Sequence, residues 1–202
     1  MANAIGPKGF VPSRYMNGSA YNGASNMYVV LAAEANQINI GDTVKSAANG
    51  DANGIPAVTK ITNGTDTCRG VVVGILVANP NNPSLVGTTL DLTVQNIPAT
   101  KAKDYYVLVA DDPNILFELE DDGAAALTAT SCNKNASYTV TNPTAPAQNS
   151  ASVLATASVA TTSTLPLKLV GLAQRPDNAF GAYANWLVRF NTHELAGSTA
   201  GV

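Results

Sequence analysis

Short stretches of alternating apolar and polar residues recur between residues 27 and 173, separated by turn residues such as Asn-Gly, Asp-Pro and Asp-Gly. None of these stretches has the 3.6-residue period of an amphipathic helix. The pattern predicts an all-β fold, a β-sandwich or barrel-like core, with no helix longer than two or three turns. The expected strands are Met27–Leu31, Asp42–Lys45, Ile55–Ile61, Gly70–Ala78, Thr89–Gln95, Tyr105–Ala110, Leu116–Glu120, Tyr138–Thr141 and Leu165–Ala173.

The stretch at residues 116–120 shows the clearest alternation, Leu-Phe-Glu-Leu-Glu. Successive side chains of a strand point to opposite faces. We therefore expect Phe117 and Leu119 to point into the core, and Glu118 and Glu120 to point to solvent.

Two other stretches are expected to be buried strands. Residues 71–77 are apolar on both faces, which is typical of a central strand, and Gly74 within them indicates either a β-bulge or a close approach of another backbone. Near the C-terminus, Trp186, Val188 and Phe190 alternate and should share the inner face of a closing strand.

The first 27 residues differ from the rest, because Gly and Pro interrupt every periodic pattern. Two arrangements fit this composition: a loop wrapped on its own domain, or an arm docked on a neighbouring subunit. We predict an extended N-terminal arm (residues 1–27) and a β domain (residues 28–202) with a low-complexity excursion at about 142–164. The arm residues expected to contact a partner are Ile5, Phe10, Val11, Tyr15 and Tyr21.

Charge is scarce in this chain. Only 12% of the 202 residues are Asp, Glu, Lys or Arg, whereas 46% are hydrophobic and the net charge is −3. An ordinary domain is about 25% charged. Scattered basic residues and a negative net charge disfavour nucleic acid as a partner, and the longest apolar run is far shorter than the ~20 residues of a membrane-spanning helix. The composition favours uncharged contacts with other proteins.

Residues able to carry chemistry are few, and we expect neither an enzyme nor a cofactor. His193 is the only histidine, and no nucleophile or phosphate-binding motif accompanies it. We expect it to bond to backbone or to a partner. Cys68 and Cys132 are either two free thiols or a disulfide, and with a single histidine they provide too few ligands for a zinc site.

Acidic residues cluster between positions 111 and 122, where Asp111 and Asp112 precede one strand and Asp121 and Asp122 follow it. Three roles are open for them: solvated turns, contacts with Lys or Arg of a neighbouring subunit, or a bound cation. The spacing does not match an EF-hand. We carry these four residues forward as candidate inter-subunit contacts.

Three segments together resemble small virion proteins of tailed bacteriophages that decorate the capsid. These segments are Gly-Pro-Lys-Gly-Phe-Val-Pro-Ser-Arg (6–14), Ala-Asp-Asp-Pro-Asn-Ile-Leu-Phe-Glu (110–118) and the stretch from Asp177 to Leu195, which contains Phe-Gly-Ala-Tyr-Ala-Asn-Trp. Residues 124–164 take no part in the resemblance. No catalytic residue is carried over by it, because none of the three segments is a chemical motif.

The resemblance implies a capsid decoration (cement) protein on the outer surface of the mature shell, where it would stabilise contacts between major capsid subunits. Its partners would be the major capsid protein and further copies of itself, with a homotrimer expected. Synthesis in the host cytoplasm followed by location on the virion exterior would fit a start without a signal-peptide pattern. The alternatives are a tail or fibre component, or a non-viral adhesin-type β subunit.

Overall fold

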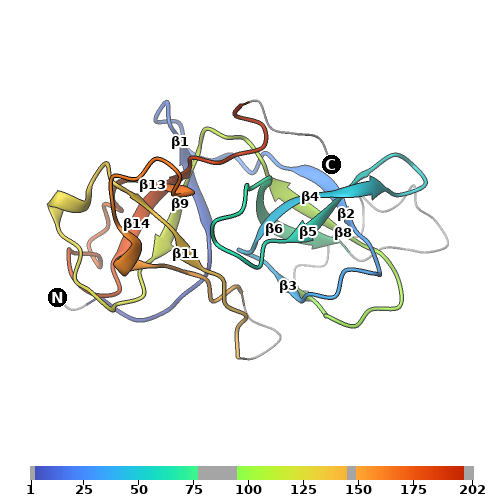
Figure 1. Ribbon diagram of the computed structural model, residues 1–202, viewed down its shortest axis with the longest axis horizontal. Coiled ribbons are helices and arrows are strands. Elements are labelled where there is room, and N and C mark those ends of the chain that lie inside the picture. The colour runs from blue at the N-terminus through green and yellow to red at the C-terminus, as the bar shows by residue number, and fades with distance from the viewer. Residues whose placement is uncertain (1–2, 77–94, 145–148, 198–202) are drawn as a thin grey trace.

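Two β-structured lobes lie side by side in the computed structural model of the chain (Figure 1). The structure describes residues 3–76, 95–144 and 149–197. In these ranges the regular structure is all strand apart from two 3-10 turns, η2 (Ala129–Ser131) and η3 (Thr156–Ser158). The predicted all-β class is therefore confirmed.

The first lobe is a closed barrel. Its strands follow the spatial order β2 (Asn26–Val30), β5 (Pro56–Lys60), β4 (Thr43–Gly50), β6 (Gly70–Leu76) and β8 (Tyr105–Ala110). β2 and β5 pair in parallel, and the other neighbours pair antiparallel. The register of β6 against β8 shifts between Val72 and Gly74, which confirms the predicted bulge. Alternate residues such as Val107 and Val109 fill the interior.

The second lobe is built on a five-stranded antiparallel sheet. Its strands follow the order β1 (Val11–Tyr15), β9 (Ile115–Glu120), β14 (Asn185–Phe190), β13 (Leu167–Leu172) and β10 (Asn135–Ala136). The N-terminal part of the chain therefore supplies the edge strand β1 of this sheet. The chain then forms the barrel and afterwards returns to supply the other strands of the sheet. Trp186, Val188 and Phe190 are buried in the core of this lobe, as the alternation predicts.

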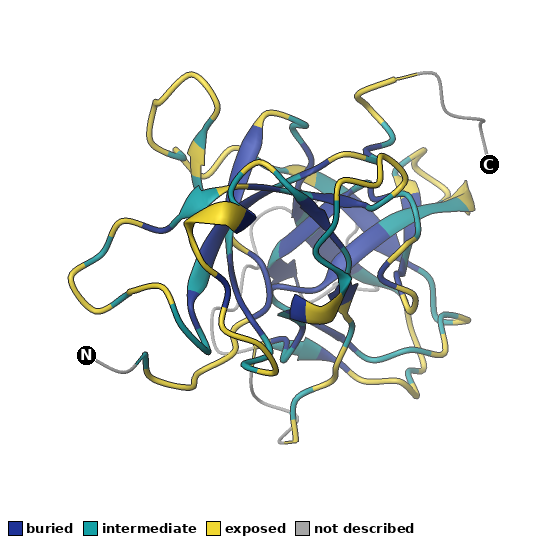
Figure 2. Cartoon of the chain, turned by 60° about the vertical axis from the view of Figure 1, so that its left-hand side comes forward, coloured by how far each residue is buried: buried dark blue, intermediate teal, exposed yellow. Residues whose placement is uncertain are grey.

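Two short ladders complete the regular structure. β11 (Tyr138–Thr139) pairs with β12 (Val153–Leu154), and β3 (Ile38–Asn39) pairs with β7 (Asn96–Ile97). The burial map shows dark blue strands in both lobes surrounded by exposed loops (Figure 2). Leu154 is fully buried, so part of the low-complexity excursion packs on the core. The expected strand Thr89–Gln95 lies outside the described residues except for Gln95.

The N-terminal segment joins the two lobes. Phe10 N–H donates to the carbonyl oxygen of Gly41 at 3.0 Å, beside the barrel. Gly9 has a φ of +67°, and a Cβ at this position would lie 2.5 Å from the Gly41 oxygen. A residue without a side chain is therefore required at this crossing.

The prediction of a separate N-terminal arm was wrong. Residues 11–15 form β1 and pair with β9, although Pro12 lies within the strand. Proline is compatible with this position because β1 is the edge strand of the sheet. Residues 1–27 thus contain part of the β domain rather than a segment outside it.

Candidate partner-binding surface

The aromatic residue expected to lead partner contacts, Phe10, lies in the core of its own chain. Its side chain is 1% exposed, and its ring centroid lies 4.9 Å from that of Tyr138, 5.1 Å from Phe190 and 6.2 Å from Phe117. Burial among three aromatic rings leaves no surface for a partner, which corrects the assignment of Phe10 as a contact residue.

Tyr15 and Tyr21 pack on each other, with ring centroids 6.1 Å apart, and both are partly buried against the core of the sheet lobe. The Tyr15 hydroxyl donates to Asn22 Oδ1 at 3.1 Å, and the Tyr21 hydroxyl donates to the Ala24 carbonyl at 2.9 Å. The two side chains therefore stabilise the local turn between β1 and residue 24, and both are only partly exposed.

Ile5 and Val11 remain at the surface, with 67% and 40% of each residue exposed. The backbone N–H of Gly6 donates to the Glu120 carboxylate at 3.1 Å, which places Ile5 at one end of β9. Asn3 fixes the same segment to the loop before β14, because its Nδ2 donates to the carbonyl oxygens of Ala179 and Ala182 at 2.9 Å.

Four further apolar residues are exposed: Met16, Val170, Phe180 and Leu195. Of these, Val170 and Leu195 were not singled out from the sequence. Phe180 is 48% exposed and directly follows Ala179, the residue held by Asn3, so it lies at the same end of the sheet as Ile5.

Val11, Glu118 and Leu187 lie in register across β1, β9 and β14. They share the face opposite the buried residues Phe117 and Val188. We call this the outer sheet face, and include in it Ile5 at its Glu120 end. Phe180 lies at the same end, but its ring packs on Trp186 of the buried face, with ring centroids 5.8 Å apart, so it is not part of the outer sheet face.

Glu120 belongs to the same face but is only 5% exposed, so the prediction that it points to solvent was wrong. Gly6 covers its carboxylate and donates the hydrogen bond described above. Burial raises the pKa of Glu120 above its usual value. Beside it, Arg175 Nη1 pairs with Glu118 Oε2 at 2.8 Å, and the space between these groups and Lys8 is a pocket of about 60 Å³.

Asp111 and Asp121 are internal groups rather than inter-subunit contacts. Asp111 is 6% exposed and accepts from the Tyr28 hydroxyl at 2.5 Å and from Asn26 Nδ2 at 2.9 Å. Burial, together with the hydrogen bond to Asp111, raises the pKa of Tyr28 to about 12. Asp121 is fully buried and accepts the backbone N–H of Tyr183 at 2.7 Å. These bonds explain why both carboxylates face inward.

Asp112 and Asp122 are half-buried and fix local turns. Asp112 accepts the backbone N–H of Asn114 at 2.8 Å, and Asp122 accepts the Thr156 hydroxyl at 2.6 Å. Within the described part of the chain, no group of three or more His, Cys, Asp or Glu side chains is placed to hold a metal ion. The sequence cluster is thus divided among separate turns.

His193 closes the junction between the lobes. Its Nδ1 accepts the backbone N–H of Leu195 at 3.1 Å, and it forms a parallel bridge with Cys68. Burial lowers the pKa of His193 and raises that of Cys68. Cys68 and Cys132 are both free thiols, so the disulfide alternative is not realised.

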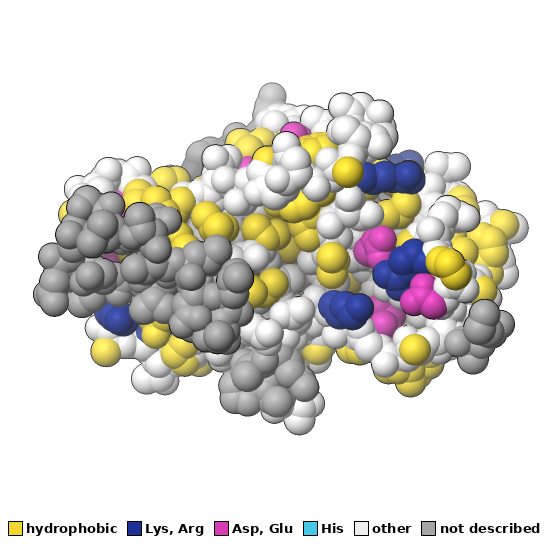
Figure 3. Space-filling model, turned by 180° about the vertical axis from the view of Figure 1, so that it is seen from behind, with side chains coloured by type: hydrophobic (Ala, Val, Ile, Leu, Met, Phe, Trp, Pro, Cys, Tyr) yellow, Lys and Arg dark blue, Asp and Glu magenta, His cyan; other side chains and the backbone are white. Residues whose placement is uncertain are grey.

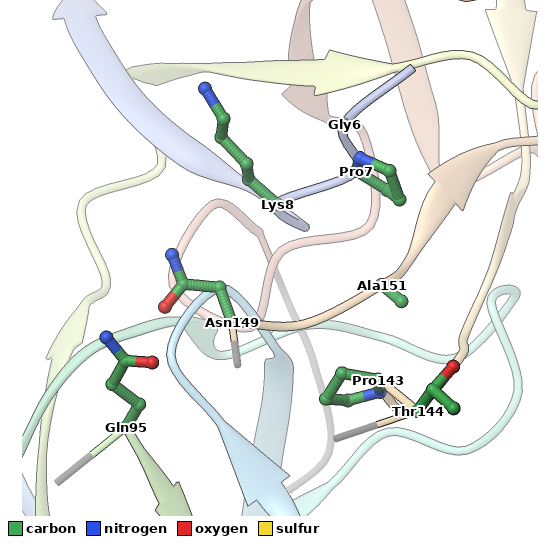
Figure 4. A pocket seen from close by; sticks show the side chains of 8 residues that line it. All are labelled: Gly6, Pro7, Lys8, Gln95, Pro143, Thr144, Asn149 and Ala151. Atoms are coloured by element: carbon green, nitrogen blue, oxygen red, sulfur yellow. The ribbon is translucent and has the colours of Figure 1, made fainter. Parts of the chain in front are cut away.

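An open pocket of about 460 Å³ lies between the N-terminal segment and the connection from β11 to β12, with Gln95 beside them (Figure 4). It is lined by Gly6, Pro7, Lys8, Gln95, Pro143, Thr144, Asn149 and Ala151. Lys8 is the only charged side chain in this lining. Among the described residues, the other side chains of the lining are two amides, two prolines, a threonine and an alanine.

Charged side chains are sparse on the face seen from behind (Figure 3). Acidic and basic groups intermingle in one area on the right of that view, over the sheet lobe, and uncharged side chains cover most of the remaining coloured surface.

No helix in the described ranges is long and apolar enough to cross a membrane. A scan against protein-family models and searches of curated proteins and of solved structures found no match.

Proposed function

We propose that this protein is a capsid decoration (cement) protein of a tailed bacteriophage. In this function it binds the outer surface of the mature shell and stabilises contacts between major capsid subunits. It acts as a structural protein without catalytic chemistry, and it assembles with further copies of itself, as a homotrimer, on the virion exterior.

One observation carries the proposal. The three segments that resemble phage decoration proteins are far apart in the sequence, yet residues 6–14 contribute β1, residues 110–118 contribute most of β9, and residues 177–195 contribute β14. These strands are neighbours in one sheet, in the order β1, β9, β14. The resemblance is therefore concentrated in one continuous structural unit, which supports a shared binding role for that unit.

The outer sheet face of this unit is the proposed attachment surface. It offers the exposed apolar side chains of Ile5 and Val11 beside the Glu118–Arg175 ion pair. Apolar groups beside a few charged ones are typical of protein interfaces. A shell presents many copies of the binding site, so binding to the assembled lattice shifts the equilibrium toward it by mass action.

The test is reconstitution on particles that lack the protein, with bound copies counted by gel densitometry and cryo-EM. Ile5→Asp and Val11→Asp should each weaken binding tenfold or more, because burial of such a side chain contributes about 1.5–3 kcal/mol. Leu195→Asp is the matched control, since Leu195 is 49% exposed and lies at the lobe junction rather than on the sheet.

The outcomes test the decoration function and the assignment of the attachment surface separately. If the unaltered protein does not bind shells, the decoration function is refuted. If it binds and the Ile5 and Val11 variants bind equally well, the function stands and the outer sheet face is not the attachment surface.

A further inference from the structure

A lysine, an aspartate and an asparagine from three separate parts of the chain converge at the junction between the lobes. Lys60 Nζ donates to Asp42 Oδ2 at 2.6 Å and to Asn142 Oδ1 at 2.6 Å. The side chains of Lys60 and Asp42 are 3% and 0% exposed. The second carboxylate oxygen of Asp42, Oδ1, is buried without a hydrogen-bond partner.

The geometry brings an amine close to the carbon of a carboxamide. A C=O bond is about 1.2 Å long, so the Asn142 Cγ lies within about 3.8 Å of Lys60 Nζ. This separation is close to the ~3–3.5 Å from which a nucleophile can attack.

Local structure holds these groups in place. Lys60 is the last residue of β5, and Asp42 lies in the turn before β4, where its Oδ2 also accepts the Asn39 N–H at 2.8 Å. Asn142 follows β11 by three positions. The backbone positions of these residues, at a strand end, in a turn and after a strand, bring the three side chains within hydrogen-bonding distance.

The reaction needs Lys60 as a free amine, which is the nucleophilic form of lysine. Asp42 Oδ2 lies 2.6 Å from Lys60 Nζ and is placed to accept a proton from it. Both side chains are almost fully buried, and among the described residues no donor reaches Asp42 Oδ1, so this oxygen is free to carry a proton.

We propose that Lys60 and Asn142 become joined by an intramolecular isopeptide bond, with Asp42 as the proton shuttle. The lone pair of Lys60 Nζ attacks Cγ of Asn142 and forms the new N–C bond. Asp42 then carries a proton from Nζ to Nδ2, the Cγ–Nδ2 bond breaks, and ammonia leaves. The product differs from the unmodified chain by the loss of one ammonia molecule, and no oxidant or other reactant is consumed.

The bond would tie the barrel covalently to the connection between β11 and β12, which belongs to the second lobe. Asn142 is exposed on its other side, which provides an exit for ammonia. Pro143 follows Asn142, and proline has no backbone N–H. Asn142 therefore cannot lose ammonia by attack of the next backbone nitrogen, as asparagines before glycine can.

The experiment is intact-mass and peptide mass spectrometry of the purified full-length protein under denaturing conditions. We expect a mass lower than that of the sequence by one ammonia. After trypsin digestion we expect a branched peptide in which residues 46–69, uncleaved at Lys60, are joined to residues 135–168. An unmodified mass, or a free peptide ending at Lys60, would overturn the proposal.

Variants assign the loss to this site. Asn142→Ala alters an exposed side chain, so it should fold and should show the full mass of its sequence. Asn149→Ala, another exposed asparagine nearby, is the matched control and should still lose ammonia. Asp42→Asn should leave the chain uncross-linked. If the Asn142 variant still loses ammonia, the loss arises elsewhere and the proposal is wrong.

Discussion

Replacing Phe10 with Ala should destabilise the protein strongly. The side chain is 1% exposed and lies against the rings of Tyr138, Phe190 and Phe117. Truncation of a buried Phe to Ala costs about 3–5 kcal/mol, because both the transfer free energy and the packing around the cavity are lost. A typical domain unfolds with about 5–15 kcal/mol, so the loss should be a large part of the total.

Urea unfolding monitored by the fluorescence of Trp186 measures this effect. Trp186 is the only tryptophan and is fully buried in the same core. Val11→Ala is the matched control, because Val11 is the next residue, is 40% exposed, and should change the unfolding free energy by less than about 0.5 kcal/mol. Phe10→Leu should fall between the two variants and keeps the test usable if Phe10→Ala does not fold.

The opposite result would refute the reasoning. If residues 1–27 formed an arm that docks on a neighbour, Phe10→Ala would leave the unfolding free energy of the isolated protein near that of the Val11→Ala control. A loss below about 1 kcal/mol would show that the Phe10 ring does not contribute to the core in solution.

Two further predictions concern acid stability and assembly. Burial lowers the pKa of His193, so the unfolded chain binds a proton below pH ~6.5 more readily than the folded protein does. The unfolding free energy, measured by urea unfolding, should therefore decrease as the pH is lowered from ~7.5 to ~5.5. The His193→Gln variant should show a smaller decrease over the same range, and an equal decrease in both proteins would contradict the prediction. Light scattering should give a particle of three times the 20.7 kDa chain mass, and a monomer at tens of micromolar would contradict a preformed homotrimer.

Local pattern was sufficient to predict several of the strands but not their partners. The stretches at 105–110 and 70–76 and the bulge at Gly74 follow from alternation and from the position of a glycine. β1 was missed because Gly9 and Pro12 interrupt the pattern, whereas pairing with β9 supplies the order that local propensity lacks.

The candidate surface was predictable only in part, for a related reason. Ile5 and Phe10 look alike as apolar residues in an irregular segment, yet one is exposed and the other is enclosed by rings from three distant positions. Burial of a side chain outside a periodic element depends on contacts that are remote in sequence. Glu120 was misjudged for the same reason, since the residue that covers it is Gly6.

The few charges of this chain are used partly to hold its interior together. Five charged side chains are buried among the described residues: Asp42, Lys60, Asp111, Glu120 and Asp121. Asp42, Lys60 and Asp111 lie where the lobes or their connections meet, and Asp121 fixes the loop that leads into β14. The surface is therefore even poorer in charge than the 12% composition suggests. A surface with so little charge has weak electrostatic repulsion between copies and a low desolvation cost on contact, which favours the dense protein–protein packing that the proposed decoration function requires.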